Sequence, residues 1–272
     1  MTSLGNLGSF SRLVAALSGW LDRVVIIGGW AHRLYRLHPY AQALGYAPLT
    51  TLDTDVAIPA ELPAATEDIR QRLLDHGFTE EFLGDDRPPA THYRLGDETS
   101  GFYAEFLTPL VGSGYDRKST RKATARIAGV TSQRLRHIDV LLIDPWVIEF
   151  DLTGVAEERK TVRIANPACF LAQKILIHSR RSGEKRAKDI LYIHDTLEVF
   201  GAQLDELHAQ WQSRIAPRLH RNHVQVVRKA PDRVFGGITD SIRDAAIIAA
   251  GRDLTPESVR DACQFGLQQL FG

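Results

Sequence analysis

The sequence predicts an α/β or α+β domain followed by a helical domain, and two features of the pattern support this. In residues 1–165, short apolar, β-branched blocks alternate with stretches of helical spacing, with turn residues between them. From Asn166 onward, apolar residues recur at helical spacing with few strand-like runs. A chain of 272 residues is long enough for two modest domains. We therefore expect a first domain over 1–165 and a helical domain over 166–272.

In the first part, helices and strands are expected to alternate. Helices are predicted over 9–22, 30–44 (ending at Gly45) and 66–76, the last with Thr66 as N-cap and Gly77 as C-cap. Strands are predicted over 24–29, 51–58, 91–95, 102–108 and 161–164. Two hairpins are expected, one through Gly96–Gly101 and one over 137–151 that turns at Asp144–Pro145.

The second part is expected to be helical throughout. Asn166 can cap a helix that has Pro167 at its first position and runs to about Ser182. Thr255 and Pro256 repeat this signal further along the chain. The remaining helices are expected over 184–200 (ending at Gly201), 203–215, 217–229, 237–250 and 255–270.

Composition excludes several classes of protein. Lys plus Arg is 33 and Asp plus Glu is 33, and this balance argues against a protein that coats duplex DNA. No stretch reaches the ~18 apolar residues of a membrane span, and the N-terminal residues lack a signal-peptide pattern. Cys169 and Cys263 lie far from any C-x-x-C spacing and are expected to be buried, reduced thiols. We expect a cytoplasmic protein with no membrane partner.

The main chemical signal is a pair of acids in the strand predicted over 51–58. Residues i and i+2 of a strand point to the same face, so Asp53 and Asp55 should lie together, with Thr51 on that face too. Two like charges on one face repel each other unless a cation lies between them. Carboxylate oxygens are the ligands that Mg²⁺ takes, and the ion keeps positions open for phosphate oxygens. The pair therefore suits a magnesium site.

A diglycine precedes these acids. Gly28 and Gly29 follow a buried strand and open a helix, so the backbone can approach a phosphate closely. Trp30 comes next, and we weigh two roles for it: a core aromatic, or a ring that packs on a nucleotide base. A phosphate-binding turn beside a metal-binding pair of carboxylates is typical of enzymes that transfer phosphoryl or nucleotidyl groups.

The order strand, Gly28-Gly29, helix, and then a strand with Asp53-x-Asp55 resembles the nucleotidyltransferase superfamily with the polymerase-β-like fold. The resemblance implies a mixed sheet flanked by helices, an NTP such as ATP as substrate, and Mg²⁺ with Mn²⁺ as the alternative ion. It also implies a third carboxylate on a neighbouring strand. Glu105 is the first candidate, and Asp139 and Glu149 are its rivals. The 24 positions from Gly29 to Asp53 exceed the commonest spacing and leave the subfamily open.

A second resemblance covers 166–193. It is similar to the helical segment of bacterial nucleotidyltransferases related to abortive-infection and toxin–antitoxin toxins, in which a lysine precedes an (Arg/Lys)-x-Lys-Asp run. Lys174 and the run Arg186-x-Lys188-Asp189 match those positions. The resemblance implies that Lys174 binds triphosphate oxygens, that Arg186 and Lys188 contribute to nucleotide binding, and that Asp189 orients Lys174 or acts as a base. A plain salt bridge between Lys174 and Asp189 is the alternative.

These observations predict an enzyme that transfers a nucleoside monophosphate from an NTP to an acceptor hydroxyl. The acceptor is left open between RNA or tRNA, a protein and a small molecule, and a toxin would add an antitoxin partner. A basic stretch over 116–126 is interpreted either as a contact to phosphates or as a solvated loop. The alternative function is an inactive nucleotide-binding or protein-interaction module of the same fold. Residues 196–272 resemble no family.

Overall fold

The computed structural model describes residues 4–62, 67–86, 88–96, 101–115, 122–152 and 158–272. Contacts divide the chain into two units, and residues 1–37 with 50–165 form the first. Residues 38–49 with 166–272 form the second. The two units divide the chain after Ala165, and residues 38–49 group with the helical unit, which was not expected from the sequence.

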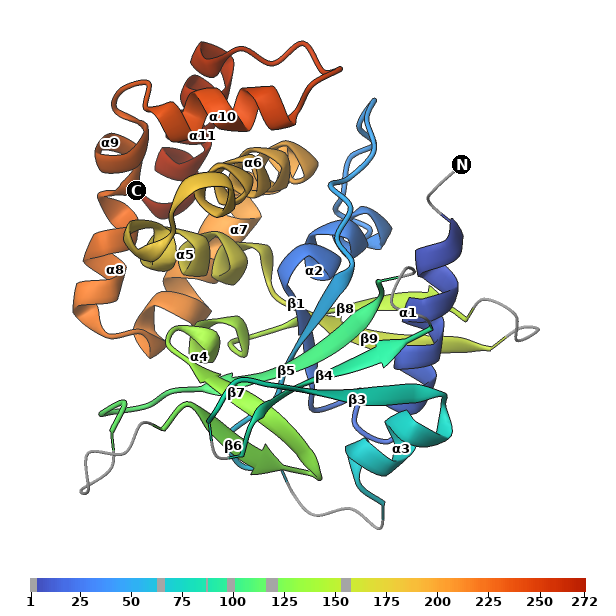
Figure 1. Cartoon of the computed structure of the whole chain (residues 1–272). Coiled ribbons are helices and arrows are strands. Elements are labelled where there is room, and N and C mark those ends of the chain that lie inside the picture. The colour runs from blue at the N-terminus through green and yellow to red at the C-terminus, as the bar shows by residue number, and fades with distance from the viewer. Residues whose placement is uncertain (1–3, 63–66, 87, 97–100, 116–121, 153–157) are drawn as a thin grey trace. The chain divides into compact units, whose positions relative to one another are not determined.

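The first unit is built on a mixed sheet of nine strands in the order β3-β4-β5-β2-β1-β9-β8, with β7 against β5 and β6 against β7 (Figure 1). Parallel pairs are β2 with β5, β1 with β9 and β5 with β7, and the other pairs are antiparallel. The strands are β1 (Val25–Ile27), β2 (Asp53–Ala57), β3 (Phe78–Leu83), β4 (Ala90–Leu95), β5 (Tyr103–Pro109), β6 (Thr124–Ile127), β7 (Val130–Leu135), β8 (Trp146–Asp151) and β9 (Arg159–Ile164).

The helices of the first unit flank this sheet (Figure 1). They are α1 (Leu4–Ala16), α2 (Gly28–Leu34), α3 (Ile69–Asp75) and α4 (Ile138–Leu141), with a 3₁₀ turn at Tyr35–Leu37. Phe10 of α1 stacks on Trp30 of α2 with ring centroids 4.2 Å apart, and the edge of Phe150 of β8 meets Phe10. These aromatic side chains are buried and form the centre of the core.

The second unit is helical. Its helices are α5 (Pro167–Ile177), α6 (Gly183–Val199), α7 (Leu204–Gln210), α8 (Arg221–Arg228), α9 (Ala230–Phe235), α10 (Asp240–Ile248) and α11 (Pro256–Phe271), with a π-helix at Trp211–Ile215 and 3₁₀ turns at His178–Arg180, Gly201–Gln203 and Ala216–Arg218. Asn166 caps α5 by accepting a hydrogen bond from the Ala168 N–H, and Thr255 caps α11, as predicted.

The predicted mixed α/β fold with a C-terminal helical region is confirmed. Cys169 and Cys263 are buried free thiols, as expected. Most predicted strands and the long helices of the second part are present with shifted ends, whereas β3, β6, β7 and α9 were not predicted. The expected helix 9–22 ends at Ala16. The Thr66 cap and most of the basic stretch lie outside the described residues, and Asp68 is the N-cap of α3.

Two other expectations were wrong. The helix expected over 30–44 ends with the 3₁₀ turn at Leu37, because Pro39 lacks an N–H and disfavours helical backbone at the preceding residue. The expected hairpin over 137–151 does not form. Its first half is helix α4, Asp144 takes a left-handed φ of 45°, and β8 pairs with β9 instead. A short apolar run fits a helix turn as well as a strand, which explains the error.

Candidate functional site

The candidate site starts from the alternation of β2. Thr54 and Val56 are fully buried, while Asp53 and Asp55 on the opposite face are partly exposed. Strand geometry therefore places both carboxylates on one face, as predicted. Thr51, just before the strand, donates a hydrogen bond from its hydroxyl to Asp53 Oδ1.

Glu105 joins these acids through the register of the sheet. β5 lies parallel to β2, and Glu105 is the direct partner of Asp55. Directly paired residues on neighbouring strands project to the same face. Asp53, Asp55 and Glu105 each offer a carboxylate oxygen, and these oxygens lie within 4.8 Å of one another. The structure thus brings together the three acids expected to form the site, which we call the carboxylate triad.

The diglycine lies against this triad. Gly28 is the first residue of α2 and has φ of +64°, a region that favours glycine. A Cβ built on Gly28 would lie 2.0 Å from Asp55 Oδ2, so only glycine leaves room for that carboxylate. Gly29 follows it in the same helix. The backbone of the diglycine therefore borders the candidate ion site.

Two neutral or weakly basic side chains approach Glu105 from adjacent strands. The Gln133 side-chain amide donates a hydrogen bond to Glu105 Oε2 at 2.9 Å. His92 Nε2 lies 3.6 Å from the same oxygen. These partners fix the Glu105 carboxylate while the triad keeps its excess negative charge.

Tyr103 completes the surroundings. Its ring stacks on His92 with centroids 4.3 Å apart, and it is the register partner of Asp53. Burial raises the pKa of Tyr103 to about 12, and the negative charges of the triad add to that shift. Sequence reasoning missed His92, Gln133 and Tyr103, because only the pairing of distant strands brings them to the triad. The one local signal was the position of Tyr103, two residues before Glu105.

The donor set fits a hard divalent cation. Three carboxylates that converge within one ion's reach repel one another, and a bound Mg²⁺ or Mn²⁺ would remove that repulsion. All three offer oxygen, which is the ligand type of these ions. Asp53, Asp55 and Glu105 would hold the ion.

The two rival third carboxylates lie elsewhere. Asp139 is exposed on α4. Glu149 lies on β8, at the edge of the sheet beyond β1 and β9, and accepts a hydrogen bond from the Thr161 hydroxyl at 2.9 Å. Within the described ranges, neither acid belongs to the triad.

The base-stacking role considered for Trp30 is wrong. Its side chain is fully buried, stacked on Phe10, and its ring meets the edge of Phe102. Because the Trp30 ring is fully buried between these side chains, a nucleotide base has no access to it.

In the helical unit, Lys174 and Asp189 form a buried ion pair. Lys174 Nζ lies 2.5 Å from Asp189 Oδ1, and both side chains are less than a tenth exposed. Arg181 Nε approaches the other oxygen of Asp189 at 3.1 Å. This geometry favours the salt-bridge interpretation of the pair, and its contact with phosphate stays a prediction.

The other two residues of the basic run have different surroundings. Lys188 is exposed and pairs with Glu184 one turn earlier in α6, at 2.6 Å. Arg186 donates a hydrogen bond from Nη2 to the Arg181 carbonyl. Phosphate contacts of Arg186 and Lys188 also stay predictions.

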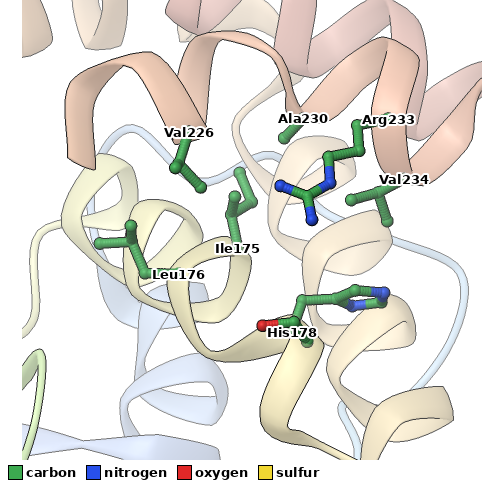
Figure 2. Close-up of a pocket in the computed structure, with 8 residues that line it drawn as sticks. Ile175, Leu176, His178, Val226, Ala230, Arg233 and Val234 are labelled. Atoms are coloured by element: carbon green, nitrogen blue, oxygen red, sulfur yellow. The ribbon is translucent and has the colours of Figure 1, made fainter. Parts of the chain in front are cut away.

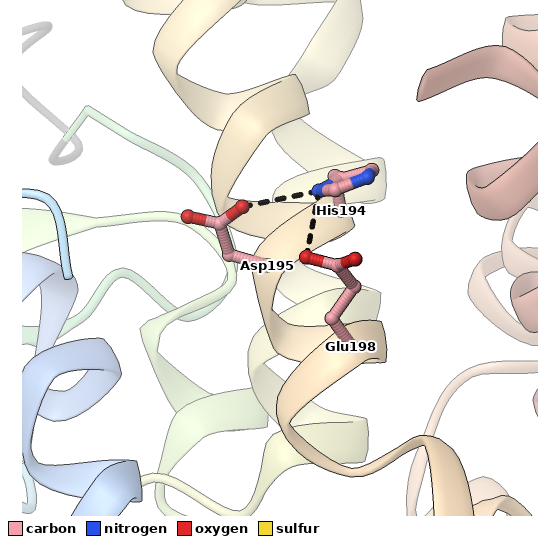
Figure 3. A group of neighbouring side chains, drawn as sticks. All are labelled: His194, Asp195 and Glu198. Carbon is pink, nitrogen blue, oxygen red and sulfur yellow. Dashed lines mark hydrogen bonds and ion pairs between the residues drawn. The ribbon is translucent and has the colours of Figure 1, made fainter. Parts of the chain in front are cut away.

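A second cluster of potential ligands lies on α6. His194, Asp195 and Glu198 project together, and the imidazole of His194 approaches both carboxylates (Figure 3). Arg252 contacts both oxygens of the buried Asp195 at 2.8 Å, and the Tyr46 hydroxyl donates to Glu198. Because arginine already neutralises the deepest acid, this cluster is a structural ion-pair network.

The helical unit also contains a small cavity between α5, α8 and α9 (Figure 2). Its wall is mostly aliphatic, and Arg233 and His178 supply its polar edge. It contains no carboxylate and so lacks the ligands for a divalent ion.

Three converging carboxylates beside a diglycine in a mixed α/β domain are typical of proteins that act on phosphate substrates with a divalent cation. The chain belongs to the nucleotidyltransferase family, because the family model described as "Nucleotidyltransferase" matches residues 6–216, more than half of the chain. No curated protein matches the chain. Among the described residues, every helix is too short or too polar to cross a bilayer.

Proposed function

We propose that this chain transfers a nucleoside monophosphate from an NTP to an acceptor hydroxyl at the carboxylate triad, with Mg²⁺ as the ion. The observation that carries the proposal is the convergence of Asp53, Asp55 and Glu105 within 4.8 Å, with Gly28 packed against Asp55. Family membership supports the same reaction class.

In this proposal, each residue of the site has a stated task. A bound divalent ion supplies charge stabilisation for the phosphates of the NTP. Asp53, Asp55 and Glu105 hold that ion, and the hydrogen bond from Gln133 fixes the Glu105 carboxylate toward it. Gly28 leaves space for the Asp55 carboxylate.

The phosphate-binding groups follow from their position in the chain. The backbone N–H groups of Gly28 and Gly29 are donors near the triad that can contact the triphosphate. The Thr51 hydroxyl donates to Asp53 Oδ1, so it would contact the nucleotide by exchanging that hydrogen bond. ATP is one NTP that fits this role, since the site contacts described above involve phosphates and not the base. Lys174, Arg186 and Lys188 extend the phosphate-binding set, with Asp189 orienting Lys174.

The acceptor is a hydroxyl of RNA or tRNA, a protein or a small molecule. A toxin that acts in the cytoplasm and is neutralised by an antitoxin protein is the most specific form of this proposal. Growth arrest on expression, relieved by Asp53→Ala, is the result expected for that form. Normal growth at high expression would favour a small-molecule acceptor.

The central experiment compares the triad with matched acids. We would prepare Asp53→Asn, Asp55→Asn and Glu105→Gln, with Asp139→Asn and Glu149→Gln as controls from the same unit. Calorimetry would measure the binding of Mg²⁺, Mn²⁺ and each NTP. Pyrophosphate release would measure turnover with RNA, protein and small-molecule acceptors.

The triad variants are expected to lose Mg²⁺ binding and to lower turnover by about two orders of magnitude or more, which is about 2.7 kcal/mol of transition-state stabilisation. The two control variants should keep both properties. Nucleotide binding without turnover on any acceptor would favour the inactive-module alternative. Unchanged Mg²⁺ binding in the triad variants would refute the site.

A further inference from the structure

The segment 211–233 has an unusual charge for this chain. It contains six Lys and Arg residues against one acid, Asp232, while the whole chain has a formal net charge of zero. Five of these six cations lie beyond residue 216, where the family match ends. We call 211–233 the basic segment.

The fold exposes these cations. The segment runs through the π-helix, the 3₁₀ turn Ala216–Arg218, α8 and the start of α9. Its six cations are all exposed: Arg214, Arg218, Arg221, Arg228, Lys229 and Arg233. Its apolar side chains Trp211, Ile215 and Val227 are buried and anchor it to the unit. The segment is therefore a fixed surface with its charges directed to solvent.

Its parts are linked in space. Arg221, Gln225 and Arg228 follow the i, i+4, i+7 pattern that places residues on one face of α8, and all three are exposed. Arg228 donates a hydrogen bond to the Gln212 side chain at 3.3 Å, so the end of α8 meets the start of the segment. The cations thus belong to one folded patch.

Most of these charges are uncompensated. Among the described residues, Arg218, Arg221, Lys229 and Arg233 form neither an ion pair nor a side-chain hydrogen bond. Elsewhere in the same unit, Arg243 pairs with Asp240 at 2.8 Å and Arg260 pairs with Asp261 at 2.6 Å. Unpaired surface cations produce a positive potential that attracts a polyanion.

Two further observations indicate the kind of polyanion. The described large hydrophobic side chains that are exposed all lie outside 211–233, so the patch lacks the bulky apolar residues typical of membrane-surface helices and protein hot spots. At its edge, Arg233 extends over the cavity beside His178 (Figure 2). The pKa of His178 is lowered, first by burial and then by the charges of Arg186 and Arg233. Arg233 therefore places one cation of the segment beside the cavity, which residues of α5 also line.

We infer that the basic segment binds the phosphate backbone of an RNA acceptor. The inference rests on the proposed function, because it assigns RNA as the molecule that supplies the acceptor hydroxyl. RNA is favoured over duplex DNA because the chain as a whole has a formal net charge of zero, whereas proteins that cover duplex DNA are strongly basic. Contacts of this kind carry affinity without reading sequence.

The test measures RNA binding in the absence of NTP and metal, so that its outcome is independent of catalysis. The probe is a labelled single-stranded RNA of about 20 nucleotides, measured by fluorescence anisotropy from roughly 50 to 200 mM salt. The variant is Arg218→Gln with Arg221→Gln and Lys229→Gln. The matched control removes three paired cations: Arg159→Gln, Arg243→Gln and Arg260→Gln. Circular dichroism would verify that both triple variants are folded.

The basic-segment variant is expected to lose RNA affinity by about tenfold or more. The slope of log affinity against log salt concentration should fall in magnitude by about 2, since each of the three removed phosphate contacts contributes ~0.7 in single strands. The control should bind as the parent protein does. Equal loss in both variants, no loss in either, or tighter parent binding to duplex DNA or to phosphatidylserine vesicles would overturn the inference. If RNA binds as expected but pyrophosphate is never released, the proposed function fails and the RNA surface stands. If pyrophosphate is released but RNA does not bind, the proposed function stands and the RNA surface is refuted.

Discussion

At the scale of single residues, the candidate site depends on the missing side chain of Gly28. We predict that Gly28→Ala abolishes Mg²⁺ binding and nucleotide transfer. The new Cβ would fall 2.0 Å from Asp55 Oδ2, and the φ of +64° would add strain of roughly 1–2 kcal/mol. Calorimetry with Mg²⁺ and a pyrophosphate assay measure both effects.

Gly8→Ala is the matched control for that variant. Gly8 lies within α1, and a Cβ there meets nothing within 4 Å. The substitution should keep Mg²⁺ binding and raise the free energy of unfolding by roughly 0.5–1 kcal/mol, since alanine favours a helix over glycine. A Gly28→Ala protein that binds Mg²⁺ normally would show that Asp55 is not a ligand.

The half-buried imidazole of His178 gives the protein a predicted pH dependence. The pKa of His178 is lowered from 6.5 by burial and by Arg186, so the unfolded chain binds a proton more readily than the folded one. The contribution of His178 to stability is then present above pH 6.5 and is lost as the pH falls through its lowered folded pKa. Acid should therefore destabilise the protein through this group.

The measurement is chemical unfolding of the parent and of His178→Gln between neutral and mildly acidic pH. The parent should lose more stability than the variant on acidification. His38, whose pKa burial also lowers, gives the variant a remaining slope of the same sign. Identical pH profiles for the two proteins would contradict the assignment to His178.

At the scale of elements, α5 and α6 are joined by the buried pair Lys174–Asp189. We predict that Asp189→Ala destabilises the protein by about 3–5 kcal/mol, because it leaves a buried ammonium without its carboxylate. The double variant Lys174→Met with Asp189→Leu removes both charges and should recover most of that loss. Thermal melting measures the stability of each.

The same double variant separates the two interpretations of Lys174. If the pair is a structural link, the folded double variant keeps its nucleotide transfer rate. If Lys174 binds the triphosphate, the rate falls although the protein is folded, and the KM for NTP rises. Activity at saturating and limiting NTP distinguishes these outcomes.

Elements with a local signal could be predicted from the sequence, and those decided by distant partners could not. Asn166 with Pro167 and Thr255 with Pro256 are caps that act within one turn, and both helices begin where predicted. β3 was not predicted because Glu80 and Glu81 interrupt its apolar pattern, and the strand forms by pairing with β4. A distant partner also explains the error at 137–151. The apolar run there forms helix α4, and β8 pairs with β9 instead of with that run.

At the scale of the whole molecule, the sequence likewise predicts the site residues that share a strand but not those that distant strands bring together. Asp53 and Asp55 share a face because of strand periodicity, which the sequence contains directly. Glu105 joins the site only because its strand lies beside β2. The resemblance to the nucleotidyltransferase superfamily, and no local pattern, implied that arrangement. His92 and Gln133 come from β4 and β7, which pair with successive parts of β5 along the edge opposite β2. Local patterns carry no information on that register.

The path of the chain between the two site motifs was also unpredictable. Residues 38–49 join α2 to β2, yet they belong to the helical unit. The Gln42 N–H donates to the Val199 carbonyl at 2.9 Å, and Arg252 lies 3.7 Å from the centroid of the Tyr46 ring. Since Arg252 also neutralises the buried Asp195, this segment covers a charged network of its own unit.

We therefore predict that a fragment of residues 166–272 is incomplete, although it contains every helix of its unit. Without residues 38–49, the fragment lacks the Tyr46 ring over Arg252 and the hydrogen bonds to α6. A synthetic peptide of residues 38–49 should bind the folded fragment and raise its melting temperature. At 100 times its Kd, the peptide should increase the free energy of unfolding by about 2.7 kcal/mol. The same peptide with Tyr46→Ala should have little effect. A fragment that melts at one temperature with or without the natural peptide would show that the helical unit is complete from residue 166, and that the intervening segment only connects the two motifs.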